Sequence, residues 1–297
     1  MLRHALLLLL AAALPQSFAV RLLPCGVLLE KEYVLTTQEE YILRCQLFIP
    51  AGHRLNISAG VTILALGSDG SIPALVIERG GAIYALGTAD KPITFTAFDE
   101  QTPSSVTVST DSQVSTELVV GRRGKWGGVV MLGRAPVNAP GGTSTVEGLH
   151  GPLYGGRDSR YGGDDPHDSS GALRFVRIWH AGAVVAQDDE INGLTLGGVG
   201  DGTVLDHVEV AYSLDDGVEL FGGTVNLRHL SVLFAVSRRC RRRACMSSLA
   251  AAAPYAHRGA SRQRLMAVAL PDRGVRPRAM TASTSTRAIR ARASSSS

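Results

Sequence analysis

Three segments of this chain decide its fold: ALRFVRI at residues 172–178, VLDHVEV at 204–210 and NLRHLSV at 226–232. They share one apolar pattern and are spaced 32 and then 22 residues apart. A second series lies between them, where residues 192–196 match residues 216–220 at an offset of 24. Apolar and polar residues alternate in each segment, which is the pattern of a half-buried β-strand.

Repeats of 20 to 50 residues that contain short strands are typical of a solenoid. We therefore predict parallel coils stacked about 4.8 Å apart, with apolar side chains inward. On the outer side, Arg177 and Glu209 should stack as an exposed salt bridge worth under about 1 kcal/mol. The predicted inward ladders are Leu173–Leu205–Leu227, Val176–Val208–Leu230 and Ile178–Val210–Val232.

Earlier parts of the chain extend the same pattern. Residues 55–67 and 75–87 match at an offset of 20, so we read them as two early coils. Further strands are predicted at 92–98 and 126–132. The polar stretches 99–124 and 134–170 are predicted to be excursions from the stack, which as a whole spans residues 55–236.

The N-terminal residues 1–19 have the features of a secretory signal. Residues 5–14 are an apolar run too short to span a bilayer, and Ser17-Phe18-Ala19 is a cleavage sequence. We expect a secreted or cell-surface protein with no transmembrane segment in the mature chain, and a cap over residues 20–54 that covers the first coil.

Export would favour a disulfide between Cys25 and Cys45, although two buried thiols are the alternative. Asn56 begins the glycosylation sequon Asn56-Ile57-Ser58, which matters only in a eukaryotic secretory pathway.

Charge divides the chain into two unequal parts. Of the 30 Lys and Arg residues, 14 lie in residues 238–297 together with a single acid, whereas residues 1–237 contain 16 basic and 25 acidic residues. The acidic body argues against a nucleic-acid partner. Residues 237–297 are rich in Ala, Arg and Ser without strand periodicity, so we predict a disordered tail. A shifted reading frame and a genuine basic arm both explain this tail.

Several motifs in order resemble a known family. They are GKWGG at 124–128, GALRFVRI at 171–178, EINGLTLGG at 190–198, DDG at 215–217 and FGGTVN at 221–226. Together they resemble secreted bacterial-type proteins with a right-handed parallel β-helix, similar in fold to pectin lyases. The resemblance covers about residues 28–236 and ends where the basic tail begins. It implies the fold and export, but no settled activity and therefore no catalytic residue.

Acidic residues gather at the turns that precede two of the predicted strands: Asp188, Asp189 and Glu190 in one coil, and Asp215 and Asp216 in the next. Stacking should bring them onto one edge, where the five could bind a cation such as Ca²⁺. Asp215 and Asp216 could also serve as acid and base in glycoside cleavage. The simplest explanation is that Asp before Gly is a turn residue.

His207 and His229 should align on the outer surface, but the pattern places no third ligand beside them, so we predict no metal site there. No nucleotide-binding loop is present, because Gly198–Gly202 is not followed by a helix and Trp126 stands where a phosphate loop needs Ser or Thr. We predict a non-catalytic extracellular β-helix that contacts a polysaccharide or a surface protein and needs no cofactor. The alternative is a polysaccharide hydrolase or lyase that uses the Asp-rich edge.

Overall fold

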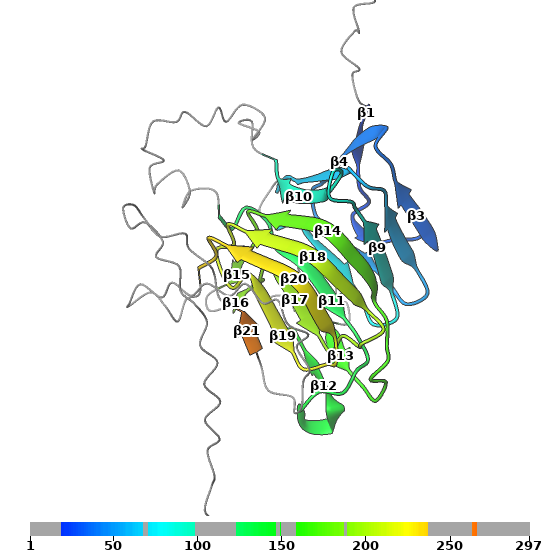
Figure 1. Ribbon diagram of the computed structural model, residues 1–297, viewed down its shortest axis with the longest axis vertical. Coiled ribbons are helices and arrows are strands. Elements are labelled where there is room, and N and C mark those ends of the chain that lie inside the picture. Colours follow the sequence, from blue (N-terminus) through cyan, green and yellow to red (C-terminus); the bar gives the residue numbers. More distant parts are fainter. Residues whose placement is uncertain are drawn as a thin grey trace, which may run out of the picture.

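The computed structural model describes residues 19–67, 71–98, 123–146, 149, 159–186, 189–236 and 263–265, and it forms a β-helix (Figure 1). A ten-stranded and a seven-stranded sheet wrap around one core, and stacked strands run parallel throughout except at the last strand, β21. Among the described residues the one helical element is the short 3₁₀ turn η2 (Pro140–Gly142). The predicted all-β parallel β-helix is therefore confirmed. No helix in the described part of the chain is long and apolar enough to cross a membrane.

The seven-stranded sheet is the first face of the coil. Leu194 pairs with Val218 and Leu196 with Leu220, which confirms the predicted offset of 24 residues. The strands of this face are β2 (Gly26–Val27), β5 (Gln46–Ile49), β8 (Ala74–Ile77), β11 (Gly128–Leu132), β17 (Leu194–Gly197), β19 (Val218–Phe221) and β21 (Gln263–Leu265).

The ten-stranded sheet supplies the other two faces. In the early coils, the second face consists of β3 (Glu32–Leu35), β6 (Arg54–Ile57) and β9 (Ala82–Leu86), and the third consists of β1 (Ala19–Leu22), β4 (Glu39–Leu43), β7 (Thr62–Ala65) and β10 (Ile93–Ala97). In the later coils one long strand runs across both faces. These long strands are β14 (Gly171–Trp179), β18 (Val204–Ala211) and β20 (Asn226–Leu233). β14 joins the two halves because it pairs with β9 through its first residues and with β10 through its last.

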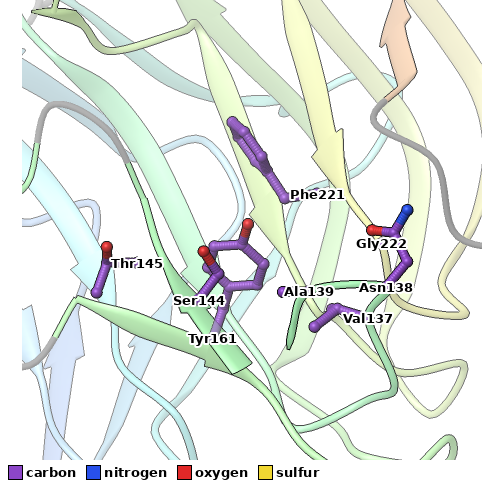
Figure 2. Close-up of a pocket in the computed structure, with 8 residues that line it drawn as sticks. All are labelled: Val137, Asn138, Ala139, Ser144, Thr145, Tyr161, Phe221 and Gly222. Atoms are coloured by element: carbon purple, nitrogen blue, oxygen red, sulfur yellow. The ribbon is translucent and has the colours of Figure 1, made fainter. Parts of the chain in front are cut away.

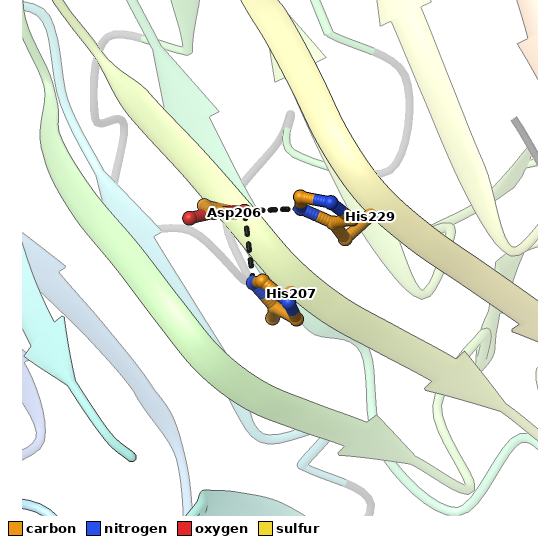
Figure 3. Close-up of side chains that lie close together, drawn as sticks. All are labelled: Asp206, His207 and His229. Carbon is orange, nitrogen blue, oxygen red and sulfur yellow. Dashed lines mark hydrogen bonds and ion pairs between the residues drawn. The ribbon is translucent and has the colours of Figure 1, made fainter. Parts of the chain in front are cut away.

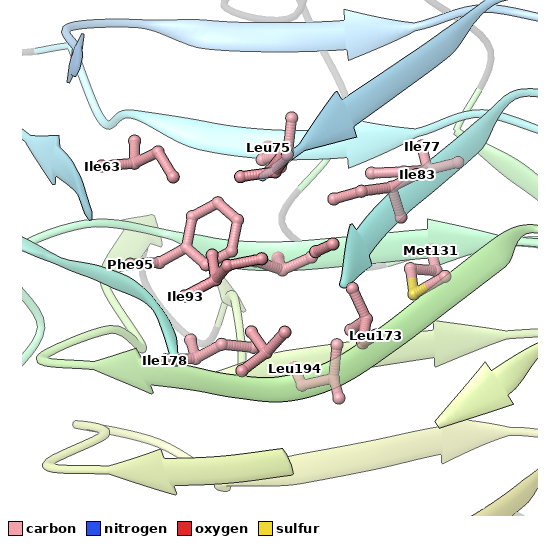
Figure 4. Close-up of a cluster of buried hydrophobic side chains, with 14 of the residues drawn as sticks. Ile63, Leu75, Ile77, Ile83, Ile93, Phe95, Met131, Leu173, Ile178 and Leu194 are labelled. Carbon is pink, nitrogen blue, oxygen red and sulfur yellow. The ribbon is translucent and has the colours of Figure 1, made fainter. Parts of the chain in front are cut away.

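The apolar ladders follow the predicted register. Leu173 pairs with Leu205, which pairs with Leu227, and the other two ladders continue in the same way. All nine side chains are buried except that of Leu227, which is partly buried against the core. Inside the coil these ladders meet residues of the first face, such as Leu194 and Met131 (Figure 4). Each buried aliphatic side chain contributes about 1.5–3 kcal/mol, so the core holds the coils in register.

The early repeat at an offset of 20 does not describe stacked coils. Leu55 lies on the second face and pairs with Ile83, whereas Leu75 lies on the first face and pairs with Leu47. The prediction was wrong because neighbouring faces of a coil carry the same alternating pattern, followed by similar turns. A shift by one face therefore matches about as well as a shift by one coil.

Both ends of the solenoid differ from the expected outline. Residues 20–54, expected to form a cap, contain β1 to β5 and join both sheets in register. At the other end, Gln263–Leu265 of the basic tail forms β21, which pairs antiparallel with β19. The rest of the predicted tail, the signal segment through residue 18 and nearly all of the excursion at 99–124 lie outside the described residues.

Two corners of the later coils turn at single residues with left-handed backbone. At the first corner these residues are Phe175, His207 and His229 (φ 47, 55 and 50°), whose rings stack with centroids 4.3 and 4.1 Å apart. At the second corner they are His180, Tyr212 and Phe234, with centroids 5.0 and 5.1 Å apart. The left-handed conformation costs about 1–2 kcal/mol per residue, and aromatic stacking of about 0.5–1.5 kcal/mol per pair offsets part of it. The stacks thus fix the ring positions along each corner.

Candidate functional site

The outer side of the first face is covered rather than exposed to solvent. Phe48, Val76 and Val130 follow one another along this outer side, and all three are buried. They pack in a second apolar cluster with Val146 and Tyr161 from the excursion between β11 and β14. The excursion therefore folds back over the sheet, and a pocket forms at the edge of this cover.

The cover is anchored by a short antiparallel hairpin, β12 (Thr143–Thr145) and β13 (Arg160–Gly162). The ring of Tyr161 lies directly over Gly197 of β17, where a Cβ atom would come within 2.7 Å of the ring. Gly197 therefore gives the tyrosine room to approach the backbone. In the next coil, Phe221 stands beside the same ring, with centroids 5.7 Å apart and planes tilted by 47°.

A pocket of about 270 Å³ opens between the hairpin and β19 (Figure 2). Tyr161 and Phe221 supply its aromatic surface, while Asn138, Ser144 and Thr145 supply polar groups. Asn138 and Thr145 are exposed, so the polar side of the pocket is open to solvent. The lining is completed by Val137, Ala139 and Gly222.

The chemistry of the lining defines what the pocket can hold. Two aromatic rings offer apolar faces, and the Ser144 and Thr145 hydroxyls with the Asn138 amide offer both donors and acceptors. None of the eight lining residues is an Asp, Glu, His, Lys or Arg, so the lining supplies neither a charge nor a general acid–base pair. Such a pocket suits a neutral ligand that has both C–H faces and hydroxyl groups.

The Asp-rich edge has a different character. Asp215 and Asp216 are 6% and 1% exposed, in the turn that leads into β19. The backbone carbonyl of Asp216 accepts hydrogen bonds from the Ser213 hydroxyl (3.1 Å) and from the N–H of Gly193 (3.0 Å). These contacts fit the turn function that the sequence allowed. Because both side chains are buried, a polysaccharide chain cannot reach their carboxylates in this structure.

Of the other predicted cation ligands, the structure describes the side chain of Glu190 only. Glu190 lies in β16 (Asp189–Glu190), which pairs with β15 (Val184–Ala186) in a separate two-stranded sheet. The side chains of Asp188 and Asp189 lie outside the described residues. Glu219, a buried acidic residue outside the predicted set, accepts a hydrogen bond from the Asn192 amide nitrogen at 2.9 Å. Within the described ranges, the predicted acidic residues form no group of three with ligand atoms within 4.8 Å of one another.

One compact group of potential ligands does exist at the first aromatic corner. Asp206 Oδ1 lies 2.9 Å from Nδ1 of His207 and 2.7 Å from Nδ1 of His229 (Figure 3). Arg174 Nη2 lies 3.3 Å from the second oxygen, Oδ2. The hydrogen bond from His229, followed by that from Arg174, lowers the pKa of the Asp206 carboxyl although burial opposes the shift. Sequence periodicity aligned the two histidines but placed no third ligand beside them. The available signal was Asp206, which directly precedes His207 one coil before His229.

Other predicted residues are placed as follows. Cys25 and Cys45 are joined by a disulfide, with Cα atoms 5.5 Å apart. The Asn56 side chain lies half-buried on β6 and donates a hydrogen bond to Glu32 Oε1 at 2.6 Å.

The expected Arg177–Glu209 salt bridge is replaced by contacts with Trp179. The indole N–H of Trp179 donates to Glu209 Oε1 at 2.7 Å, and the Arg177 guanidinium lies 5.5 Å from the centroid of the Trp179 ring. The register of the two charged residues is as predicted, but the prediction of an ion pair was wrong because Trp179, on the same strand as Arg177, contacts both of them.

Comparison with known proteins agrees with the coil architecture. No curated protein and no solved structure matches the chain significantly. The family model of the pectate-lyase-like β-helix domain matches residues 26–236, which include every stacked parallel strand except β1. This chain therefore belongs to the family of pectate-lyase-like β-helix domains.

Proposed function

We propose that this protein is exported and binds an extracellular polysaccharide, without cleaving it, in the pocket between the β12–β13 hairpin and β19. The observation that carries this proposal is the pairing of the Tyr161 and Phe221 rings beside a polar rim. Sugar rings have apolar C–H faces that pack on aromatic rings, and hydroxyls that bond to Ser, Thr and Asn side chains. The pocket offers both kinds of group within one small volume.

The size of the pocket limits the ligand to a short part of a chain. At about 270 Å³ it lies just below the usual range for small-molecule sites, which begins at about 300 Å³. One sugar unit would lie against the rings, and the rest of the polymer would extend past the exposed Asn138 and Thr145. Such contacts recognise a chain end or a single protruding residue.

A binding role is favoured over catalysis by the placement of the carboxylates. Hydrolysis of a glycosidic bond needs two carboxyl groups on either side of it, but the pocket lining contains none. Asp215 and Asp216, the candidate acid and base of the alternative enzyme, are buried. The alternative enzyme would lose all turnover of a polysaccharide in the variants Asp215→Asn and Asp216→Asn. Such a loss from an active wild-type protein would overturn the proposal.

Export is supported by two features of the chain. Residues 1–19 have the pattern of a cleavable signal, and the Cys25–Cys45 disulfide is of a kind that persists mainly in oxidising compartments. Expression in a secreting host should give a mature protein in the medium that begins at Val20. Retention of residues 1–19 in a cell-associated protein would argue against this part of the proposal.

The binding site is tested by affinity electrophoresis of the full chain in gels that contain pectin, xylan, mixed-linkage glucan or alginate. We expect at least one polysaccharide to retard the wild-type protein, and Phe221→Ala to weaken that interaction at least about tenfold, or 1.4 kcal/mol. Thr145→Ala should weaken it less, since one hydrogen bond is lost.

A matched control is Tyr84→Ala, which removes an exposed aromatic residue from β9 on a different face. This variant should be retarded like the wild type. The proposal fails if no polysaccharide retards the wild type, or if Phe221→Ala and Tyr84→Ala behave alike.

A further inference from the structure

Asp206, His207 and His229 form a group that the glycan-binding proposal does not use. They lie on β18 and β20 of the ten-stranded sheet, whereas the pocket is built on the seven-stranded sheet. Their side chains are accessible from solvent, with exposed fractions of 14%, 40% and 59%. Figure 3 shows the carboxylate beside the two imidazoles, with both Nδ1 atoms directed toward it.

The two oxygens of Asp206 have separate partners. Oδ2 faces Arg174 from the preceding coil, while Oδ1 faces both histidines. In the next coil, Arg228 is in register with Asp206, as Arg174 is in the preceding coil, but the Arg228 side chain is exposed. Arg174 therefore orients the carboxylate from behind, as outer-shell partners of metal ligands do, and leaves Oδ1 directed at the histidines.

One ligand atom in the group lacks a satisfactory partner. Nδ1 of His207 is buried, and although it lies 2.9 Å from Oδ1 of Asp206, it makes no hydrogen bond of acceptable geometry. A buried polar atom without a hydrogen bond costs about 1–3 kcal/mol. A cation bound between this nitrogen and Oδ1 would remove that cost.

The backbone holds the three residues in place before any ligand binds. His207 and His229 are both left-handed corner residues, and their rings stack with centroids 4.1 Å apart and planes 21° apart. Asp206 precedes one of them directly on β18. A ligand set fixed in this way loses little conformational freedom on binding.

We propose that Asp206, His207 and His229 bind Zn²⁺ through one carboxylate oxygen and two imidazole nitrogens, with water completing the coordination. Two nitrogens and one oxygen suit zinc and related transition metals better than Ca²⁺, which takes oxygen ligands. Ligand atoms around a tetrahedral zinc are about 3.3 Å apart, given bonds of about 2.0–2.1 Å. The present distances of 2.7 and 2.9 Å are shorter than this by about half an ångström, so zinc binding requires Asp206 and the two imidazoles to move apart by that small amount.

The site would connect two coils, since Asp206 and His207 belong to β18 and His229 to β20. Zinc would therefore stabilise the last long strand of the ten-stranded sheet. Thermal unfolding of the metal-free protein should shift to higher temperature as Zn²⁺ is added.

The proposal is tested with the metal-free full chain, by isothermal titration with Zn²⁺ and by the visible spectrum of the Co²⁺ form. We expect one site per chain and a Co²⁺ spectrum of tetrahedral intensity. The spectrum should lack a cobalt–thiolate band, which would instead indicate binding by Cys240 and Cys245, which are potential thiolate ligands in the chain. His207→Asn and His229→Asn should each weaken binding at least tenfold. Asn is chosen because it tolerates the left-handed backbone at both positions.

The control variant is His167→Asn, which removes an exposed histidine that pairs with Asp201 at 2.8 Å but belongs to no group of three potential ligands among the residues that the structure describes. It should bind Zn²⁺ like the wild type. No binding by the wild type, a cobalt–thiolate band, or equal loss in His167→Asn and His229→Asn would each overturn the proposal. The wild-type cobalt spectrum decides the outcome even if a variant fails to fold.

Discussion

At the scale of single residues, the two sides of a strand have different physical roles. Leu205 and Val204 are neighbours on β18, yet Leu205 is 2% exposed inside the coil and Val204 is 46% exposed outside it. The inner residue belongs to the ladder between Leu173 and Leu227, while the outer one has no part in the core.

Truncation of these two residues should have unequal effects. Leu205→Ala should lower the free energy of unfolding by about 2–5 kcal/mol, because it removes apolar contacts and leaves a cavity. Val204→Ala should change it by about 0.5 kcal/mol or less. Denaturant unfolding measures both, and similar losses in the two variants would mean that the inward and outward sides have been assigned incorrectly.

A second residue-scale prediction concerns pH. The hydrogen bond to Asp201 and the negative charge of that carboxylate raise the pKa of His167 above its ordinary value. A raised pKa means that the stabilisation is complete below about pH 6.5 and is lost as pH rises through the folded-state pKa. Because the pair is exposed, the change in stability should be slight. NMR titration should give His167 a pKa above 6.5, and Asp201→Asn should return it toward that value; an identical pKa in both proteins would contradict this.

At the scale of elements, sequence periodicity predicted the late coils well and the early coils less well. The three long strands carry the same pattern at fixed positions, so Leu173, Leu205 and Leu227 could be aligned directly. In the early coils each face has a strand of five residues or fewer, and the pattern of one face resembles that of the next. Periodicity then finds strands but not their partners.

The pocket could not be predicted from periodicity at all. Tyr161 belongs to the excursion and Phe221 to β19, and they meet only because the excursion folds back over the outer side of the first face. The signal in the sequence was the buried character of that outer side, where Val130 and Thr195 stand at positions that an exposed strand would fill with charged residues. Cation binding or glycoside cleavage by Asp215 and Asp216 would need accessible carboxylates, whereas both side chains are buried in the turn before β19.

The disulfide gives a prediction about the first coils. Cys25 precedes β2 and Cys45 precedes β5, so the bond links two adjacent coils and closes a loop of 20 residues. Loop-closure entropy for that length is about 3 kcal/mol. The double variant Cys25→Ser/Cys45→Ser should unfold more easily by about this amount, with faster amide exchange in β1 to β5. Unchanged exchange in these strands would show that the bond does not stabilise them.

At the scale of the whole molecule, the solenoid has an incompletely covered end. β21 pairs with β19 of the seven-stranded sheet, but in the described part of the chain β20 has a strand partner on one side only, β18. An unpaired edge of eight residues favours pairing with another chain. Light scattering should therefore show self-association of residues 20–297, which Ser231→Lys on the exposed side of β20 should reduce. A monomeric protein with one cooperative unfolding transition would contradict this prediction.

The central claim is that the Tyr161–Phe221 pocket holds a sugar ring, and saturation-transfer NMR with a bound oligosaccharide tests it most directly. Saturation of the aromatic protons of the wild-type protein should pass to ring C–H protons of one terminal sugar. The transfer should be lost in Phe221→Ala and kept in Tyr84→Ala. Transfer of equal strength in the wild type and in Phe221→Ala would contradict the claim, because it would place the sugar on another part of the molecule.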